Sequence, residues 1–234
     1  MKALIDKLLL FLVFSCSLSA SYAQTVAQNA ASRPEEIEWT WEVRPAQVEP
    51  KLPNVLLVGD SITRNYYPEV KRQLDGVANV YLFASSTSVG DPRLTHQLDE
   101  FAAMENVHFS VVHFNNGMHG WNYSEEEFKD AFPSLLHELH RIAPNAPLIW
   151  ATITPVKGEK LPGPTNARID ARNSIALSVI AKSGIPVDDQ HELMIQHKDQ
   201  YEDDVHFNPT GASIQGKQVA EFVRASLRKV ANLK

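Results

Sequence analysis

The stretch NVLLVGDSIT, residues 54–63, contains a short apolar run that ends at Gly59, Asp60 and Ser61. The run has the length and the composition of a buried strand. The glycine, acid and serine that follow have three interpretations: an ordinary turn, a phosphate-binding loop, or a serine nucleophile at the carboxyl end of a strand. The phosphate loop is the weakest interpretation, because the stretch has one glycine, no lysine, and an acid where the anion would lie.

Strand and helix patterns alternate from residue 54 onward. Apolar and β-branched runs predict strands at residues 54–59, 78–84, 107–115, 147–155 and 185–189. Helical patterns follow them at residues 67–76, 93–104, 124–142, 166–184 and 209–230. This alternation predicts an α/β fold of flavodoxin-like type: a three-layer α/β/α sandwich around a parallel sheet of about five strands.

Several polar or small residues follow these predicted strands directly. They are Ser61, Gly90, Asn115 and Asn116. The carboxyl ends of parallel strands lie along one edge of the sheet, and α/β proteins bind their ligands at that edge. The common edge favours a functional site over an ordinary turn.

The first 23 residues have the layout of a secretory signal peptide. Lys2 and Lys7 precede the apolar run of residues 8–20, and the small residues of SYA end just before Gln24. The apolar run is too short for a membrane span, and none is expected. We predict a secreted or periplasmic protein, and lipoprotein anchoring at Cys16 is the less favoured alternative.

Two further segments complete the predicted organisation. Residues 24–50 are polar and contain prolines, which predicts an N-terminal tether, although the alternation in EWTWEV (residues 38–43) could form an edge strand. The folded domain is expected to span residues 51–234.

Composition excludes several kinds of site. The formal net charge of -6 argues against a nucleic-acid-binding surface. The single cysteine, Cys16, lies in the predicted signal peptide, so cleavage would remove any cysteine nucleophile or thiolate metal ligand. His137 and His140 do not form an H-E-x-x-H motif, and we expect no metal and no cofactor.

A serine hydroxyl becomes a good nucleophile beside a histidine that is oriented by a carboxylate. His206 is the best candidate for that base, because Asp203 lies three residues before it in the polar loop EDDVHFNPTG. The carboxylate can fix the imidazole tautomer and leave the second ring nitrogen for Ser61. The alternative from the local sequence is a helix cap with a surface pair.

VGDSIT (residues 58–63) together with DDVHFNPTG (residues 203–211) resembles the SGNH, or GDSL-type, hydrolase family. The family is named for a serine, a glycine, an asparagine and a histidine in separate blocks, and the resemblance covers residues 54–225. It implies an α/β/α fold with Ser61 as nucleophile, His206 as base and Asp203 as the acid that orients the base. The chain lacks the G-x-S-x-G elbow of α/β-hydrolases.

The two middle blocks of the family would complete an oxyanion hole with the backbone N–H of Ser61. Gly90 in ASSTSVGDPR would offer its backbone N–H, with plain turn chemistry as the equal alternative. The third block, commonly G-x-N-D, reads HFNNGMHGW here, so Asn115 or Asn116 would donate a side-chain N–H. We favour Asn115. Each such donor can contribute about 3 kcal/mol to transition-state stabilisation.

These features predict a secreted serine esterase that acts through an acyl-enzyme. His119 and Trp121 could line the substrate pocket, with packing as the equal alternative for the tryptophan. Because no long apolar insertion could form a lid, the resemblance favours a carbohydrate acetyl esterase acting on small-molecule or polysaccharide esters. A lipase, thioesterase or arylesterase would use the same chemistry. A non-catalytic glycan-binding member of the fold and a flavodoxin-like electron carrier are the alternatives from other classes.

Overall fold

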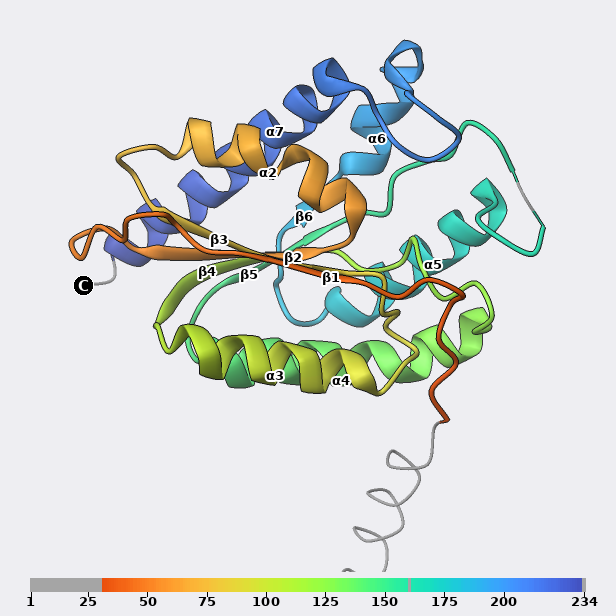
Figure 1. Ribbon diagram of the computed structural model, residues 1–234, viewed down its shortest axis with the longest axis horizontal. Helices are drawn as coiled ribbons and strands as arrows, with labels where there is room; N and C mark the ends of the chain where they lie inside the picture. Colours follow the sequence, from red (N-terminus) through yellow and green to blue (C-terminus); the bar gives the residue numbers. More distant parts are fainter. Residues whose placement is uncertain (1–30, 160, 233–234) are drawn as a thin grey trace, which may run out of the picture. The chain divides into compact units, whose positions relative to one another are not determined.

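A six-stranded sheet with the strand order β1-β3-β2-β4-β5-β6 forms the centre of the fold (Figure 1). The structure, a computed structural model, describes residues 31–159 and 161–232. Strand β1 is antiparallel to β3, and all other neighbouring strands are parallel. The strands are β1 (Thr40–Val43), β2 (Asn54–Gly59), β3 (Asn79–Ser85), β4 (Phe109–Phe114), β5 (Leu148–Ala151) and β6 (Val187–Asp188).

Helices cover both faces of this sheet. Helices α2 and α7 pack together on one face, and α3, α4 and α5 lie on the other (Figure 1). The helices are α2 (Ser61–Gln73), α3 (Arg93–Glu105), α4 (Glu125–Ile142), α5 (Asn166–Ile180), α6 (Gln190–Ile195) and α7 (Pro209–Ala231), and η1 (Lys198–Gln200) is a 3₁₀ turn. This arrangement confirms the predicted three-layer α/β/α sandwich, with six strands in the sheet rather than about five.

The additional strand comes from the segment that we predicted as a tether. Strand β1 pairs with the end of β3, and Trp41 lies opposite Ala84. The predicted signal peptide, residues 1–23 with Cys16, lies outside the described residues. Within residues 31–159 and 161–232, no helix has both the length and the apolar character that a membrane crossing requires.

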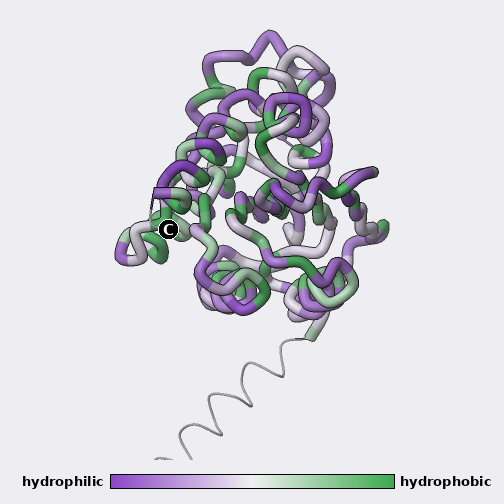
Figure 2. Tube along the Cα trace, turned by 90° about the vertical axis from the view of Figure 1, so that its left-hand side faces the viewer, coloured by the Kyte–Doolittle hydropathy of each residue, from purple (hydrophilic) through white to green (hydrophobic). Residues whose placement is uncertain are grey.

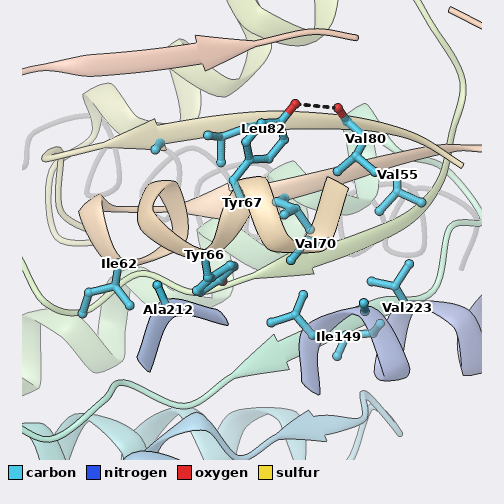
Figure 3. Close-up of a cluster of buried hydrophobic side chains, with 14 of the residues drawn as sticks. Val55, Ile62, Tyr66, Tyr67, Val70, Val80, Leu82, Ile149, Ala212 and Val223 are labelled. Atoms are coloured by element: carbon cyan, nitrogen blue, oxygen red, sulfur yellow. Dashed lines mark hydrogen bonds between the residues drawn. The ribbon is translucent and has the colours of Figure 1, made fainter. Parts of the chain in front are cut away.

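Two hydrophobic clusters fill the space between the sheet and its helices. Alternate residues of β3 point to opposite faces, so that Val80 and Leu82 pack towards α2 and α7 while Tyr81 and Phe83 pack towards α3 and α4. Figure 3 shows part of the first cluster, where the hydroxyl of Tyr67 donates a hydrogen bond to the Val80 carbonyl at 3.2 Å. In Figure 2 the helices alternate between hydrophobic and hydrophilic colours along their turns, as helices with one buried side do.

Helix α2 begins at Ser61, earlier than the predicted start at residue 67. Asp60 caps this helix, because its side chain accepts a hydrogen bond from the backbone N–H of Ile62 at 3.0 Å. A Cβ atom on Gly59 would lie 2.0 Å from the hydroxyl oxygen of Thr63. The glycine therefore allows the first turn of α2 to fold back closely against the end of β2.

The strand order places Ser61 at the topological switch point of the sheet. Strand β2 lies between β3 and β4, and the helices that follow β2 and β4 lie on opposite faces. Such a reversal opens a crevice at the carboxyl ends of the two strands. Ser61 follows β2 and Asn115 follows β4, so both residues lie beside this crevice.

Candidate active site

The structure brings together the three residues that we predicted as a catalytic triad. The Oγ atom of Ser61 lies 2.7 Å from Nε2 of His206, although the two residues are 145 positions apart in the sequence. The Nδ1 atom of the same ring lies 2.8 Å from an Oδ atom of Asp203. Nucleophile, base and orienting acid in a serine hydrolase are linked by hydrogen bonds in this order.

A tight loop holds His206 in this position. One carboxylate oxygen of Asp203 accepts the backbone N–H groups of Val205 and His206, each at 2.7 Å. The loop is closed at its base by a β-bridge between Tyr201 and Phe207, and the rings of these two residues stack with centroids 4.5 Å apart. His206 therefore lies on a loop that is braced by hydrogen bonds within its own turn.

The hydrogen bonds to Asp203 keep its carboxyl group ionised. Burial would raise the pKa of Asp203, but the backbone N–H groups of His206 and Val205 and the His206 ring lower it to about 2. The carboxylate is therefore charged at neutral pH. A charged acceptor at Nδ1 favours the tautomer that carries its proton there and leaves Nε2 free to accept a proton from Ser61.

The start of α2 supplies a favourable position for a developing negative charge. Ser61 is the first residue of this helix, so its backbone N–H has no acceptor within the helix. Helix N-termini attract anions through these N–H groups and through the helix dipole. If the Ser61 hydroxyl attacks a carbonyl group, the oxyanion on the carbonyl oxygen would therefore lie beside an N–H group that is suited to bind it.

Gly90 lies buried in the loop after β3, where its backbone N–H donates a hydrogen bond to the Ser88 hydroxyl at 3.1 Å. For Gly90 to donate to an oxyanion, this hydroxyl would have to release the N–H. A Cβ atom at Gly90 would lie 2.7 Å from the ring of Tyr123. Close packing therefore explains the glycine, and its role as an oxyanion donor stays a prediction.

The two candidate asparagines have different environments. The side chain of Asn116 accepts the N–H of Val89 and donates to the carbonyl of Thr87, both at 2.9 Å, and so ties down the loop that carries Gly90. The side-chain nitrogen of Asn115 donates to the Ala151 carbonyl at 2.6 Å. An amide nitrogen has two N–H bonds, so each side chain keeps one N–H, but the oxygen and the nitrogen of Asn116 are both already bound to the loop after β3.

We propose that Asn115 donates to the oxyanion and that Asn116 positions the loop after β3. We expect Asn115→Ala to lower kcat for p-nitrophenyl acetate by about 10²- to 10³-fold, because one preorganised donor is lost. Asn116→Ala should instead mainly lower the thermal unfolding midpoint, because two buried backbone groups lose their partners. Steady-state kinetics on folded protein measure both variants. A larger loss of kcat for Asn116→Ala would assign the donor to Asn116.

His119, which we predicted to line the substrate pocket, is held by Glu35 from the segment before β1. One carboxylate oxygen of Glu35 lies 2.9 Å from Nδ1 of His119, and the other accepts the N–H of Gly120 at 2.7 Å. Burial would lower the pKa of His119, but the hydrogen bond to Glu35 and the charge of Asp60 outweigh it and raise the pKa. The local sequence around Glu35 contains no signal for this contact.

We expect Glu35→Gln to lower the pKa of His119, as measured by NMR titration of the ring. A raised pKa in the folded state stabilises the protein below the unfolded-state pKa, and this contribution is lost as the pH rises through the folded-state value. The thermal midpoint of the wild type should therefore exceed that of the variant by more at about pH 6 than at about pH 9. An equal difference at the two pH values would contradict this account.

Trp121 packs against two arginines of α5. Its indole N–H donates to the Met118 carbonyl at 2.7 Å, and the guanidinium groups of Arg172 and Arg168 lie 4.1 Å and 5.0 Å from its ring. Burial and the charge of Arg168 lower the pKa of Arg172 to about 10. Buried Arg172 also donates to carbonyls of the loop after β4, namely those of Gly117, His119 and Gly120.

Sequence reasoning missed the role of Arg172. Its spacing of four residues from Arg168 places both side chains on one face of a helix, and this was the available signal. The two arginines hold the loop after β4, which begins at Asn115 and contains His119. Whether Trp121 contacts a substrate stays a prediction.

Three further histidines lie elsewhere in the fold. His113 is buried in β4, with its Nε2 atom 2.8 Å from a carboxylate oxygen of Asp188. His137 and His140 are exposed on α4. Among residues 31–159 and 161–232, no group of three or more His, Cys, Asp or Glu side chains is arranged to hold a metal ion.

The sequence model of the GDSL-like lipase/acylhydrolase family matches residues 57–214, from the end of β2 to the first turns of α7. The chain belongs to this family. The match confirms the SGNH, or GDSL-type, assignment that the sequence blocks predicted. The matched region of this SGNH hydrolase includes Ser61, Asp203 and His206.

Solved structures share this fold at low sequence identity. One is an acetyl xylan esterase, AlAXEase, with a TM-score of 0.57 and 16% identity over 73% of this chain and 99% of that one. A carbohydrate esterase family 3 protein from Talaromyces cellulolyticus has a TM-score of 0.58 and 15% identity over 78% and 100% of the two chains. A lipase/acylhydrolase from Enterococcus faecalis has a TM-score of 0.59 and 20% identity over 74% and 96%. No curated protein matches the SGNH hydrolase described here.

Proposed function

We propose that the protein is a secreted serine esterase that removes acetyl groups from polysaccharides. The observation that carries the proposal is the continuous hydrogen-bonded chain from the Ser61 hydroxyl through the His206 ring to the Asp203 carboxylate. A serine without such a base is a weak nucleophile. Family membership supports the ester-hydrolase class, and the predicted signal peptide supports secretion.

Acylation begins when the Ser61 Oγ atom attacks the carbonyl carbon of the ester. His206 accepts the hydroxyl proton on Nε2, and the resulting imidazolium is stabilised by Asp203. The tetrahedral oxyanion receives hydrogen bonds from the backbone N–H of Ser61 and from the side chain of Asn115. The intermediate collapses when the bond to the sugar oxygen breaks, and His206 donates its proton to that oxygen.

Deacylation repeats these steps with water as the nucleophile. His206 takes a proton from water as the water oxygen attacks the acetyl carbonyl of the acyl-enzyme. The second tetrahedral intermediate collapses and breaks the bond to Ser61 Oγ, which regains its proton from His206. The products are acetate and the free polysaccharide hydroxyl.

The names of proteins that share the fold support a short acyl group and a carbohydrate. Two proteins that share the fold are named as an acetyl xylan esterase and a carbohydrate esterase.

Acetate release is the experiment that tests this function. The purified protein is incubated with acetylated xylan, other acetylated polysaccharides and p-nitrophenyl esters of increasing chain length, with Ser61→Ala as the matched control. We expect acetate from at least one polysaccharide and a preference for the acetyl ester over the octanoyl ester. Faster octanoyl hydrolysis would favour a lipase. Binding of a polysaccharide without hydrolysis of any ester would favour the non-catalytic alternative.

A further inference from the structure

We propose that Trp39, Arg64 and Trp41 form a sugar-binding platform beside the candidate active site. The proposal deepens the proposed function and rests on it for the nature of the substrate. The platform combines the edge strand β1, which contains Trp41 and directly follows Trp39, with the first turns of α2, which contain Arg64. We expect it to bind the polysaccharide chain next to the ester that is cleaved.

The three side chains lie on the same side of the sheet. Trp41 is opposite Ala84 in the pairing of β1 with β3, and Ala84 packs in the cluster under α2 and α7. Trp39 packs against the same cluster. The guanidinium group of Arg64 lies 5.4 Å from the ring of Trp39 and 5.2 Å from the ring of Trp41, so it contacts both indoles.

Trp41 keeps a large exposed surface at this position. The exposed fraction of Trp41 is 50%, whereas Trp39 is partly buried. The residue directly opposite Trp41 on β3 is the small Ala84. A large apolar surface left exposed beside a functional site is a feature of binding surfaces.

Arg64 and Trp39 place the platform close to Ser61. Arg64 lies three residues after Ser61 in α2, and this spacing puts the two residues on one side of the helix. The ring of Trp39 meets the ring of His119 edge to face, with centroids 5.8 Å apart. His119 in turn lies near enough to Asp60 for the carboxylate charge to raise the pKa of the histidine.

The segment that carries the two tryptophans is fixed to the rest of the fold. The backbone N–H of Trp39 donates to the Ser86 hydroxyl at 2.8 Å, and the N–H of Ser86 donates to the Trp39 carbonyl at 3.0 Å. The carboxylate of Glu38 accepts the Ser86 hydroxyl at 2.9 Å and contacts Arg93 at 3.3 Å. A platform that is ordered before binding loses less conformational entropy when a ligand docks.

The chemistry of the platform suits a glycan. A pyranose ring presents C–H groups on its face and hydroxyl groups around its rim. The exposed indole of Trp41 offers a flat apolar surface for that face, and the donors of Arg64 can bind the hydroxyl oxygens. A nucleic acid is disfavoured as the ligand, because the chain has a net charge of -6.

Binding is measured in the Ser61→Ala background, so that the ester survives the experiment. Isothermal titration calorimetry with acetylated xylan, chemically deacetylated xylan and peptidoglycan fragments is performed on this variant and on the same variant with Trp41→Ala added. We expect at least one glycan to bind and Trp41→Ala to raise its Kd by about 5- to 10-fold, the loss typical of one aromatic contact. Trp41→Phe should recover part of the affinity.

Met104→Ala is the matched control. Met104 has the same exposed fraction as Trp41, 50%, and lies in the last turn of α3, outside the platform. This control should leave Kd unchanged, and thermal unfolding of every variant verifies that the fold is intact. An unchanged Kd in Trp41→Ala, or no binding of any of the glycans, would overturn the platform.

The outcome for the platform is separable from that for the esterase. Tryptophan-dependent glycan binding without acetate release from any substrate would support the platform and contradict the proposed function. Acetate release from a polysaccharide with a KM that is unaffected by Trp41→Ala would support the proposed function and contradict the platform. In the wild-type background, we expect Trp41→Ala to raise KM for the polymer more than KM for p-nitrophenyl acetate.

Discussion

Ser61→Ala is expected to lower kcat for p-nitrophenyl acetate by about 10⁴- to 10⁶-fold, because the nucleophile of the acyl-enzyme pathway is removed. The hydroxyl lies 2.7 Å from Nε2 of His206, and alanine has no atom that could take its place. Residual hydrolysis would come from direct attack of water on an ester whose carbonyl oxygen still receives hydrogen bonds from the oxyanion donors. Active-site titration and steady-state kinetics at neutral pH measure the loss.

A second serine provides the control for this result. Ser134 is exposed on α4, on the opposite face of the sheet from α2. Ser134→Ala should retain the wild-type kcat, and both variants should unfold at similar temperatures. A Ser61→Ala protein that keeps more than about one tenth of the wild-type kcat would contradict a covalent role for Ser61.

Asp203→Asn should lower kcat by about 10³- to 10⁴-fold while the fold persists. An asparagine amide can present its N–H₂ group to the His206 ring, which would favour the tautomer with the proton on Nε2. That tautomer cannot accept the Ser61 proton. The variant is measured with the same ester substrates, and KM should change much less than kcat because Asp203 acts through the His206 ring.

Asp204→Asn, at the neighbouring position, is the control for Asp203→Asn. The backbone carbonyl of Asp204 accepts the N–H of Lys157 at 2.8 Å, a contact that the substitution does not remove. We expect its kcat to stay within about threefold of the wild type, since the His206 ring is held by Asp203. A greater loss at position 204 than at position 203 would reassign the acid.

The α/β/α fold was predictable because its signals are local. Apolar runs such as residues 54–59 and capped helices such as the one after Ser124 can be recognised from a few neighbouring residues. The early start of α2 was missed because the polar residues of its first turn obscure the pattern. The Asp60 cap and the close approach of Thr63 to Gly59 explain this early start, and both contacts depend on how β2 and α2 are arranged in the folded protein.

The site was predictable to the extent that short blocks mark it. Ser61, Asp203 and His206 stand in recognisable sequence contexts, and the structure places their side chains in contact. Glu35 could not be found in this way, because its contact with His119 joins positions 84 residues apart, and its own segment is polar and irregular. Long-range contacts of this kind depend on the tertiary fold and leave no periodic pattern in the chain.

The two asparagines illustrate the same limit. Strand alternation predicts that Asn115 and Asn116 point in different directions, and their hydrogen-bond partners differ accordingly. The alternation does not indicate which direction leads to the oxyanion. The ties from Asn116 to Thr87 and Val89 provide the physical reason to choose Asn115, and they involve a loop that the local sequence does not connect to it.

Covalent labelling by a fluorophosphonate probe tests the central claim most directly. The native protein is treated with the probe, digested, and analysed by mass spectrometry for the modified peptide. An activated Ser61 predicts one phosphonylated serine, at position 61, and strongly reduced labelling in His206→Ala and in heat-unfolded protein. No adduct on the native protein, or an adduct on a different serine, would contradict the assignment of Ser61 as the nucleophile.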